Sequence, residues 1–259
     1  MKTIIISDLH NRVNWIENML LSPLLNPYDR VLFLGDYFDD FNDTIEDVTN
    51  AAKWLKQSIK KPNRIHLTGT HDIWYRFPHN RFIAASGNTE KKAYAIRSIM
   101  TQDDWNKLYL YHYEQNFLMS HAGTHLNLIS EYVFDHQDLF NKYIINQELH
   151  LTTQEIIDKV IKPACEEALN RVQQGYSHPW LDAGTVRGGR QSVGGITWLD
   201  WIYEFKPIPG INQIVGHTEL YIPEEKYIKS SRNYDLDTRS QYIGILENGR
   251  FIWIENPYL

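Results

Sequence analysis

Three short polar clusters in the first 72 residues constrain the fold of this chain more than any other feature. They read Ser7-Asp8-Leu9-His10, Gly35-Asp36-Tyr37-Phe38-Asp39-Asp40 and Gly69-Thr70-His71-Asp72. Each cluster directly follows a short apolar run rich in Ile, Val and Leu, which is typical of a buried parallel strand. The expected strands are residues 3–6, 31–34 and 65–68.

Helices are expected between these strands, over 13–21 and 43–60, where apolar residues recur at helical spacing. The pattern is therefore β-α-β-α-β, with carboxylates and imidazoles at the carboxyl end of every strand. Because ligands bind at that edge of an open α/β sheet, we expect the three clusters to meet in one site.

Two further histidines follow apolar runs later in the chain. His121 comes after an expected hairpin of 111–115 and 116–120, and His217 comes after an expected strand at 211–215. A single sheet cannot easily provide so many strands that are each followed by a carboxylate or an imidazole. We therefore expect an α/β fold, a four-layer α-β-β-α sandwich of two mixed sheets flanked by helices, with a metal site at the carboxyl edge of the strands. The prediction is a single domain over 1–259, with a helical or loop insertion around 124–195.

Other segments give more local predictions. An irregular segment is expected at 73–86, and a helix is expected at 102–109 behind a Thr101 N-cap. Helical spacing continues over 153–174, where Pro163 has to kink or divide the helix. Asn248-Gly249 between apolar runs predicts a hairpin of 241–246 and 251–254.

Composition excludes several classes of protein. A formal net charge of −6 argues against binding to long nucleic acid, which needs a basic surface. The single cysteine, Cys165, forbids an intrachain disulfide and indicates a reducing compartment. The apolar run of the N-terminal MKTIII is too short for a signal peptide, and no run is long enough for a membrane span. We therefore expect a cytoplasmic protein without a membrane partner.

The clustered side chains are those of a metal site. Asp8 and His10 are two residues apart, so an extended backbone directs both to the same side, and they suit Mn, Fe, Zn or Ni. Asp36 could bridge two cations through its two oxygens, and His121 and His217 would complete the second site. Two such cations activate a water for attack on phosphorus. Taken singly, Asp8 and Asp36 could instead be helix N-caps.

The ordered motifs resemble the calcineurin-like metallophosphoesterase superfamily, most closely its phosphoprotein phosphatase branch with small bacterial and phage members. The motifs are Asp-x-His, Gly-Asp-x-x-Asp, Gly-x-His-Asp, Ser-His-Ala-Gly and Gly-His-Thr, and they span residues 8 to 218. The resemblance implies that Asp8, His10 and Asp36 hold one metal, and that Asp36, His121 and His217 hold the other.

The same resemblance implies catalytic roles and exposes two departures from the family. His71 would be the general acid that protonates the leaving oxygen, and Asp39 would orient it. Thr70 stands where the family has a metal-binding Asn, so it is at most a weak ligand. Asp40 stands where the branch has a phosphate-binding Arg. Another cation must then bind the phosphate, and the candidates are Arg187, Arg190 and Arg76, although a solvated loop explains Arg187 and Arg190 equally well.

The preferred hypothesis is a phosphatase that hydrolyses a phosphomonoester by direct attack of a hydroxide bridging two divalent ions, with manganese expected first. Its substrate would be a phosphoprotein or a nucleotide. One alternative is a phosphodiesterase acting on a small nucleotide or nucleic acid. The other is a drifted, non-catalytic metal-binding relative, which the Thr70 and Asp40 departures would fit.

Overall fold

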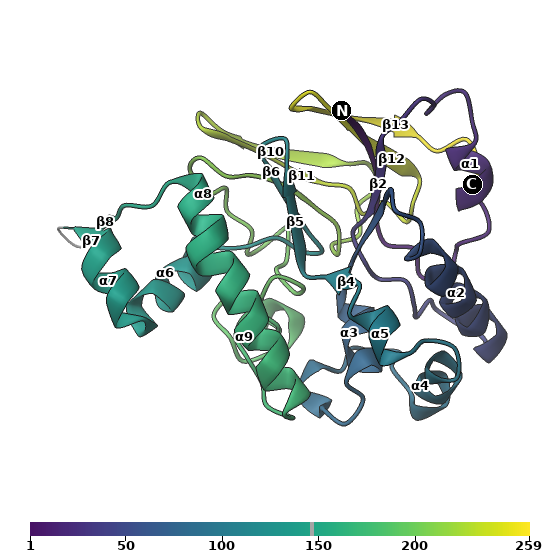
Figure 1. The fold of residues 1–259 in the computed structure, drawn as a ribbon, viewed down its shortest axis with the longest axis horizontal. Coiled ribbons are helices and arrows are strands. Elements are labelled where there is room, and N and C mark those ends of the chain that lie inside the picture. Colours follow the sequence, from purple (N-terminus) through teal and green to yellow (C-terminus); the bar gives the residue numbers. More distant parts are fainter. Residues whose placement is uncertain (146–147) are drawn as a thin grey trace.

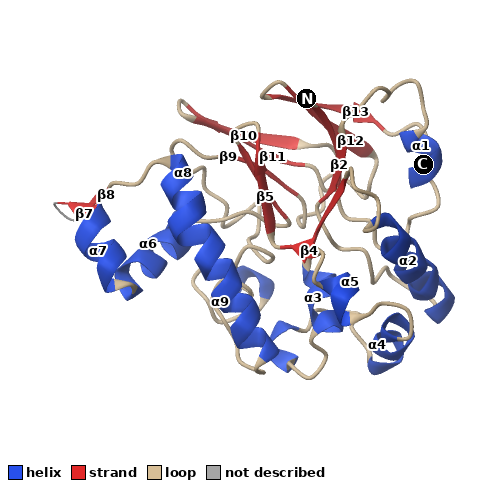
Figure 2. Cartoon of the chain, viewed as in Figure 1, coloured by secondary structure: helices blue, strands red, loops and turns tan. Residues whose placement is uncertain are grey.

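The structure is a computed structural model that describes residues 1–145 and 148–259. Strands form its centre and helices lie along its flanks (Figure 2). Two large mixed sheets with helices outside them confirm the expected α/β fold class.

The first sheet contains the three expected N-terminal strands. Its strands are β1 (Lys2–Ile6), β2 (Arg30–Phe33), β3 (Arg64–Leu67), β4 (Leu108–Tyr109), β12 (Tyr242–Glu247) and β13 (Arg250–Glu255). Their order is β13-β12-β1-β2-β3-β4. The β1, β2, β3 and β4 strands are parallel, so their carboxyl ends lie at one edge of the sheet. The expected hairpin is β12–β13, and Asn248 and Gly249 take the positive φ angles of 51° and 75° that such a turn requires.

The second sheet brings the two later histidines to the same region. Its strands are β5 (Tyr111–Glu114), β6 (Phe117–Ser120), β9 (Asn212–Val215), β10 (Glu224–Ile228) and β11 (Ser231–Asp235). Their order is β10-β11-β9-β6-β5, with β6 and β9 parallel. Strands β7 (Ile144–Ile145) and β8 (Glu148–Leu149) pair antiparallel in a two-stranded sheet that is separate from the other two.

Alternating side chains divide the core into layers. Ile5, Leu32 and Met119 belong to a buried cluster made of residues from both sheets, and this cluster fills the space between them. Ile4 and Phe33 point to the opposite face and belong to the cluster that includes apolar residues of the helices. Strands buried on both faces explain why the N-terminal runs are continuously apolar.

The helices lie outside the sheets, with α2 on one flank and α8 to α9 on the other (Figure 1). The helices of the first half are α1 (Ile16–Leu20), α2 (Ile45–Ser58), α3 (Thr70–Arg76), α4 (Glu90–Arg97) and α5 (Gln102–Trp105), with a 3₁₀ turn η1 (Arg81–Ile83). Those of the second half are α6 (Leu126–Asp135), α7 (Gln137–Tyr143), α8 (Thr153–Ile156), α9 (Lys162–Gln173), a π-helical segment η2 (Ile157–Ile161) and a 3₁₀ turn η3 (Thr185–Arg187). None of the helices in the described part of the chain is long and apolar enough to cross a membrane.

Two local predictions were wrong. The expected irregular segment 73–86 begins inside a helix, because the Asp72 carboxylate accepts the Gly69 N–H and caps α3. The expected helix 102–109 ends at Trp105, because Leu108 and Tyr109 pair with β3 as β4. The predicted division of 153–174 is confirmed by η2, which precedes Pro163 at the start of α9.

The predicted insertion around 124–195 contains helices α6 to α9 and the turn η3. Residues 146–147, which fall inside it, lie outside the described residues. The organisation of the chain as a single domain with this insertion stays a prediction.

Glu114 links β5, the edge strand of the second sheet, to two inner strands of the first sheet. This β5 carboxylate accepts hydrogen bonds from Thr3 Oγ1 on β1, at 2.5 Å, and from Arg30 on β2. The His112 ring nitrogen lies 3.1 Å from the same carboxylate. Burial would raise the pKa of Glu114, but its bonds with His112 and Thr3 and the charge of Arg30 outweigh burial and lower the pKa to about 2.

We predict that Glu114→Gln lowers the free energy of unfolding by about 2 kcal/mol at pH 7. A depressed folded-state pKa stabilises the fold above the ordinary value of 4.5 and ceases to do so as the pH falls toward 2. The difference between wild type and variant in urea unfolding should therefore shrink between pH 5 and pH 2. Glu247→Gln, at an exposed glutamate, is the control. A difference that does not change with pH would contradict this role for Glu114.

Candidate metal centre

The first candidate ligands follow β1 in a turn with unusual backbone geometry. Asp8 and His10 have positive φ angles of 36° and 44°, a region that side chains with a Cβ rarely adopt. The buried Asp8 carboxylate accepts a hydrogen bond from Ser7 Oγ and lies 3.2 Å from the backbone nitrogen of His217, which donates to it. This bond joins the end of β1 to the segment after β9.

Asp36 follows β2 and lies at the centre of the site. Its carboxylate accepts the backbone N–H of His71 at 2.8 Å. The Asp72 carboxylate in turn accepts the backbone N–H groups of Asp36, Tyr37 and Gly69, each at 2.8 Å. A Cβ at Gly69 would collide with Asp36, so glycine is required where the β2 and β3 turns meet.

The second sheet adds two histidines. His121 directly follows β6, His217 lies two residues after β9, and their ring centroids are 5.0 Å apart. His121 Nε2 is 3.3 Å from Asp36 Oδ2, and His10 Nε2 lies 3.9 Å from the same oxygen. The two sheets therefore bring imidazoles to opposite sides of one carboxylate.

The expected ligand side chains form two overlapping groups that share Asp36. One group is Asp8, His10 and Asp36, and the other is Asp36, His121 and His217. Within each group the ligand atoms lie within 4.8 Å of one another. These are the two sets that the sequence predicted, although the binding of metal by them stays a proposal.

The protonation pattern of the histidines fits a metal site. His121 Nδ1 is 3.0 Å from the Leu34 carbonyl oxygen, and His10 Nδ1 is 2.7 Å from that of Asp39. Because a carbonyl can only accept, each Nδ1 carries a proton, which leaves Nε2 as the nitrogen that can bind a metal when the ring is neutral. Within the described residues, the buried Nε2 atom of His217 has no hydrogen-bond partner, and that of His121 has only the Asp36 carboxylate, 3.3 Å away, beside it. Carboxylate oxygens and imidazole nitrogens oriented in this way are suitable ligands for divalent transition metals.

The buried carboxylates of the cluster strongly perturb one another and the neighbouring imidazole. Burial raises the pKa of Asp8 well above its ordinary value, and the neighbouring Asp237 raises it further. Burial would also raise the pKa of Asp36, but the charges of His121 and His71 outweigh it and hold this pKa well below its usual range. Burial would lower the pKa of His121, whereas Asp36 raises it to about 9. The shifts keep Asp36 ionised beside the imidazoles, whereas burial favours the neutral form of Asp8 in the absence of a nearby cation.

His71 and Asp39 lie beside the ligand groups and contact each other. His71 Nδ1 is 3.3 Å from Asp39 Oδ2, and the His71 and His10 ring centroids are 5.3 Å apart. Asp39 also accepts hydrogen bonds from Tyr75 at 2.6 Å, Asn88 at 2.7 Å and Lys92 at 2.8 Å. These three partners were not predicted, because they reach Asp39 from helices α3 and α4 and the loop between them through contacts that no local sequence pattern reveals.

Thr70 contacts Asp36. Its hydroxyl lies 3.2 Å and 3.3 Å from the two Asp36 oxygens and donates to that carboxylate. Thr70 thus lies beside the candidate ligand Asp36, and its role as a weak metal ligand stays a prediction.

The candidate phosphate-binding arginines lie in different places. Arg187 is beside the site, with Nη2 3.0 Å from Thr218 Oγ1 and Nε 2.8 Å from Asp200 Oδ2. Its charge, after burial and His121, contributes to the lowered pKa of His217. Arg190 is exposed.

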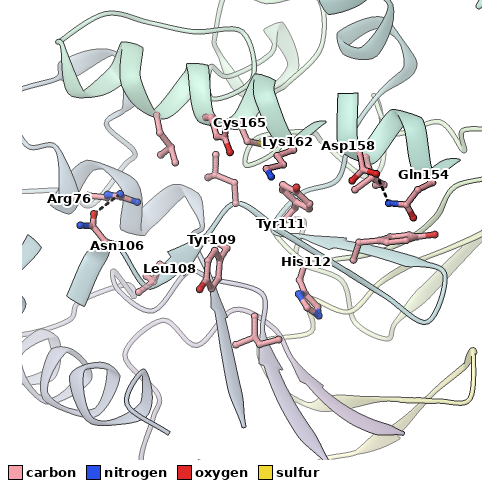
Figure 3. A pocket seen from close by; sticks show the side chains of 16 residues that line it. Arg76, Asn106, Leu108, Tyr109, Tyr111, His112, Gln154, Asp158, Lys162 and Cys165 are labelled. Carbon is pink, nitrogen blue, oxygen red and sulfur yellow. Dashed lines mark hydrogen bonds between the residues drawn. The ribbon is translucent and has the colours of Figure 1, made fainter. Parts of the chain in front are cut away.

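Arg76 faces another part of the molecule. Its Nη2 donates to Asn106 Oδ1 at 3.1 Å, and it lines a cavity of about 710 Å³ between the β4–β5 segment and the helices α8 to α9 (Figure 3). None of the candidate metal ligands lines that cavity. Arg76 is therefore badly placed to bind a phosphate at the metal centre.

A separate cleft of about 420 Å³ opens onto the metal centre. It is lined by His10, Asp39, Asp40, Phe41, Asn42, Asp43, His71, Ser86, Gly87, Thr89, Lys92, Glu219 and Arg239. The sequence did not predict Arg239, whose Nη2 is 3.2 Å from Asp40 Oδ1. Arg239 lies in a turn after β11. The strand pairing that brings this turn to the cleft joins segments far apart in the chain, so no local sequence pattern reveals it.

The comparisons agree with this geometry. The family model for calcineurin-like phosphoesterases matches residues 1–221. A cold-active protein-tyrosine phosphatase from the psychrophile Shewanella sp. has a TM-score of 0.53 at 14% identity, over 97% of this chain and 77% of that chain. A metallophosphoesterase from Sphaerobacter thermophilus has a TM-score of 0.47 at 12% identity, over 100% and 90% of the two chains. At such low identity the first likeness shows the fold alone, and the second supports no argument. Comparison with curated proteins gives no match.

Proposed function

Because the chain belongs to the calcineurin-like phosphoesterase family, we propose that it is a metal-dependent phosphatase that hydrolyses phosphomonoesters. The observation that carries this proposal is the convergence of two ligand groups on Asp36, with His71 at the same cleft. The substrate would be a phosphoprotein or a nucleotide.

The ligand residues divide into two sets around a shared carboxylate. Asp8 and His10 would hold one divalent ion, His121 and His217 would hold the other, and Asp36 would contact both. Manganese suits this mixture of oxygen and nitrogen ligands, as do iron, zinc and nickel. When bound, two such ions supply the charge that acidifies a water and neutralises phosphoryl oxygens. Thr70 would act mainly through its hydrogen bond to Asp36.

His71 is proposed as the general acid. Burial would lower the pKa of His71, but Asp36 and then Asp39 outweigh burial and raise it. Asp39 is fixed by Tyr75, Asn88 and Lys92, so it holds the His71 ring in one orientation. The raised pKa favours the protonated form of His71, which is the form that can donate a proton to the leaving oxygen.

The charges of the cleft argue against a long nucleic acid as substrate. The cleft lining includes the carboxylates of Asp40, Asp43 and Glu219, which disfavour a long polyanion, as does the net charge of −6. A cytoplasmic location stays a prediction, based on the single cysteine.

We predict that the manganese-loaded protein hydrolyses p-nitrophenyl phosphate at least tenfold faster than bis-p-nitrophenyl phosphate. The physical reason is that a monoester leaves three terminal oxygens free for the two ions. Initial rates with both esters, measured on protein of known metal content, check this preference. Faster hydrolysis of the diester would favour a phosphodiesterase, and a metal-loaded protein that hydrolyses neither would be a non-catalytic relative.

We predict that His71→Ala lowers kcat by about 10²–10⁴-fold for alkyl phosphates. The loss should be much smaller for p-nitrophenyl phosphate, because its leaving group departs without protonation. The measurement is kcat for both esters in wild type and variant. His79→Ala, at an exposed histidine in a different cavity, serves as the control. Equal losses for aryl and alkyl esters would contradict the assignment of His71 as the general acid.

A further inference from the structure

Arg239 is a cation in the cleft to which the reaction proposed above assigns no role. It lines the same cleft as His10 and His71. It belongs to the turn 237–240, which follows β11 in the second sheet. The side chain is 40% exposed, so the guanidinium can be reached from solvent.

The turn that carries Arg239 is fastened to the metal-ligand loop. Ser240 Oγ lies 3.3 Å from the backbone oxygens of both Ser7 and Asp8, and the Arg239 N–H donates to Asp237 Oδ1 at 3.1 Å. The position of Arg239 is therefore fixed relative to Asp8, one of the proposed ligands.

The backbone at this position is strained for a residue with a side chain. Arg239 has a φ angle of 55° and Ser240 one of 63°. Non-glycine residues adopt this left-handed region at an energetic cost, and such residues cluster at functional sites. Glycine would relieve the strain at position 239, which makes Arg239→Gly a variant that removes the guanidinium without disfavouring the turn.

Other charged groups in the cleft leave Arg239 as the available cation. Lys92 Nζ lies 2.8 Å from Asp39 and 2.7 Å from Asp43, and its side chain is 10% exposed, so both carboxylates already neutralise it. Arg239 contacts Asp40 at 3.2 Å and only approaches Glu219, at 4.0 Å. Histidines aside, Arg239 is thus the cationic side chain that still has free N–H donors among the described residues that line the cleft.

Asp40 has a second cation nearby. Arg12 Nε lies 3.8 Å from Asp40 Oδ2, and Arg12 Nη1 donates to the Arg239 carbonyl oxygen at 3.1 Å. If Arg239 turned from Asp40 toward a ligand, Asp40 would still have Arg12 as its partner. The pair with Asp40 can therefore hold Arg239 ready without preventing it from binding elsewhere.

We propose that Arg239 binds the phosphoryl group of the substrate, and that Asp40 holds its guanidinium when no substrate is present. A guanidinium presents several N–H donors in a planar fork, which matches two oxygens of a phosphate. The inference rests on the proposed phosphatase function and names the residue that replaces the missing arginine at position 40.

The test is the binding of inorganic phosphate to the manganese-loaded protein, measured by calorimetry, together with KM and kcat for p-nitrophenyl phosphate. For Arg239→Gly we expect at least tenfold weaker phosphate binding and at least a tenfold higher KM. The melting temperature should be unchanged or higher. Arg239→Lys should bind phosphate with intermediate affinity, because it keeps the charge but loses the fork. Arg250→Ala, at an exposed arginine lining a different cavity, should match wild type.

Each outcome decides one of the two proposals. Unchanged phosphate affinity and KM in a folded Arg239→Gly protein would overturn the role of Arg239 and leave the phosphatase function intact. A wild-type protein that hydrolyses no phosphate ester would overturn the proposed function, while the phosphate titration would still decide the role of Arg239. A lowered melting temperature with unchanged phosphate affinity would show that Arg239 is only a structural partner of Asp40.

Discussion

The burial of Asp8 and Asp36 at the meeting edge of two sheets is the constraint on which the rest of the structure depends. Their exposed fractions are 0% and 2%. Buried carboxylates are costly unless hydrogen bonds or cations compensate them. Backbone N–H groups of His71 and His217 supply part of this compensation, and the histidines of both sheets supply another part. A site with so many converging acids is suited to bind cations, and it fits the phosphate chemistry of the family.

Much of the fold could be predicted because its strands are short apolar runs that end in polar clusters. Each of the three N-terminal strands begins one residue before its expected start and ends within one residue of its expected end, because Ile, Val and Leu set these bounds locally. The errors arose where distant contacts outweigh local pattern. Leu108 and Tyr109 look helical beside the Thr101 cap, yet they pair with β3, and only the folded sheet provides that partner. Strands β10 and β11 and helix α4 were missed for the same reason, since they depend on neighbours far away in the chain.

The convergence of the candidate metal ligands could be predicted, and the cations of the neighbouring cleft could not. Asp36, His121 and His217 each follow a strand, so sheet topology alone brings them to one edge. Arg239 reaches the cleft from a turn and Lys92 from helix α4, and in both cases tertiary contacts rather than sequence periodicity bring the side chain there. Arg76 illustrates the converse, because a suitable residue type at the end of helix α3 lines a different cavity. Residue identity thus predicts which chemical groups are available, whereas tertiary contacts decide where those groups lie.

The most direct test of the central claim, that Asp36 joins two cations, is electron paramagnetic resonance on protein loaded with Mn²⁺, combined with a count of bound metal. We predict two ions per chain with the spectrum of a magnetically coupled pair. Asp36→Asn should abolish the coupling and lower the count. A single bound ion, or two ions with independent spectra in the wild type, would contradict the account.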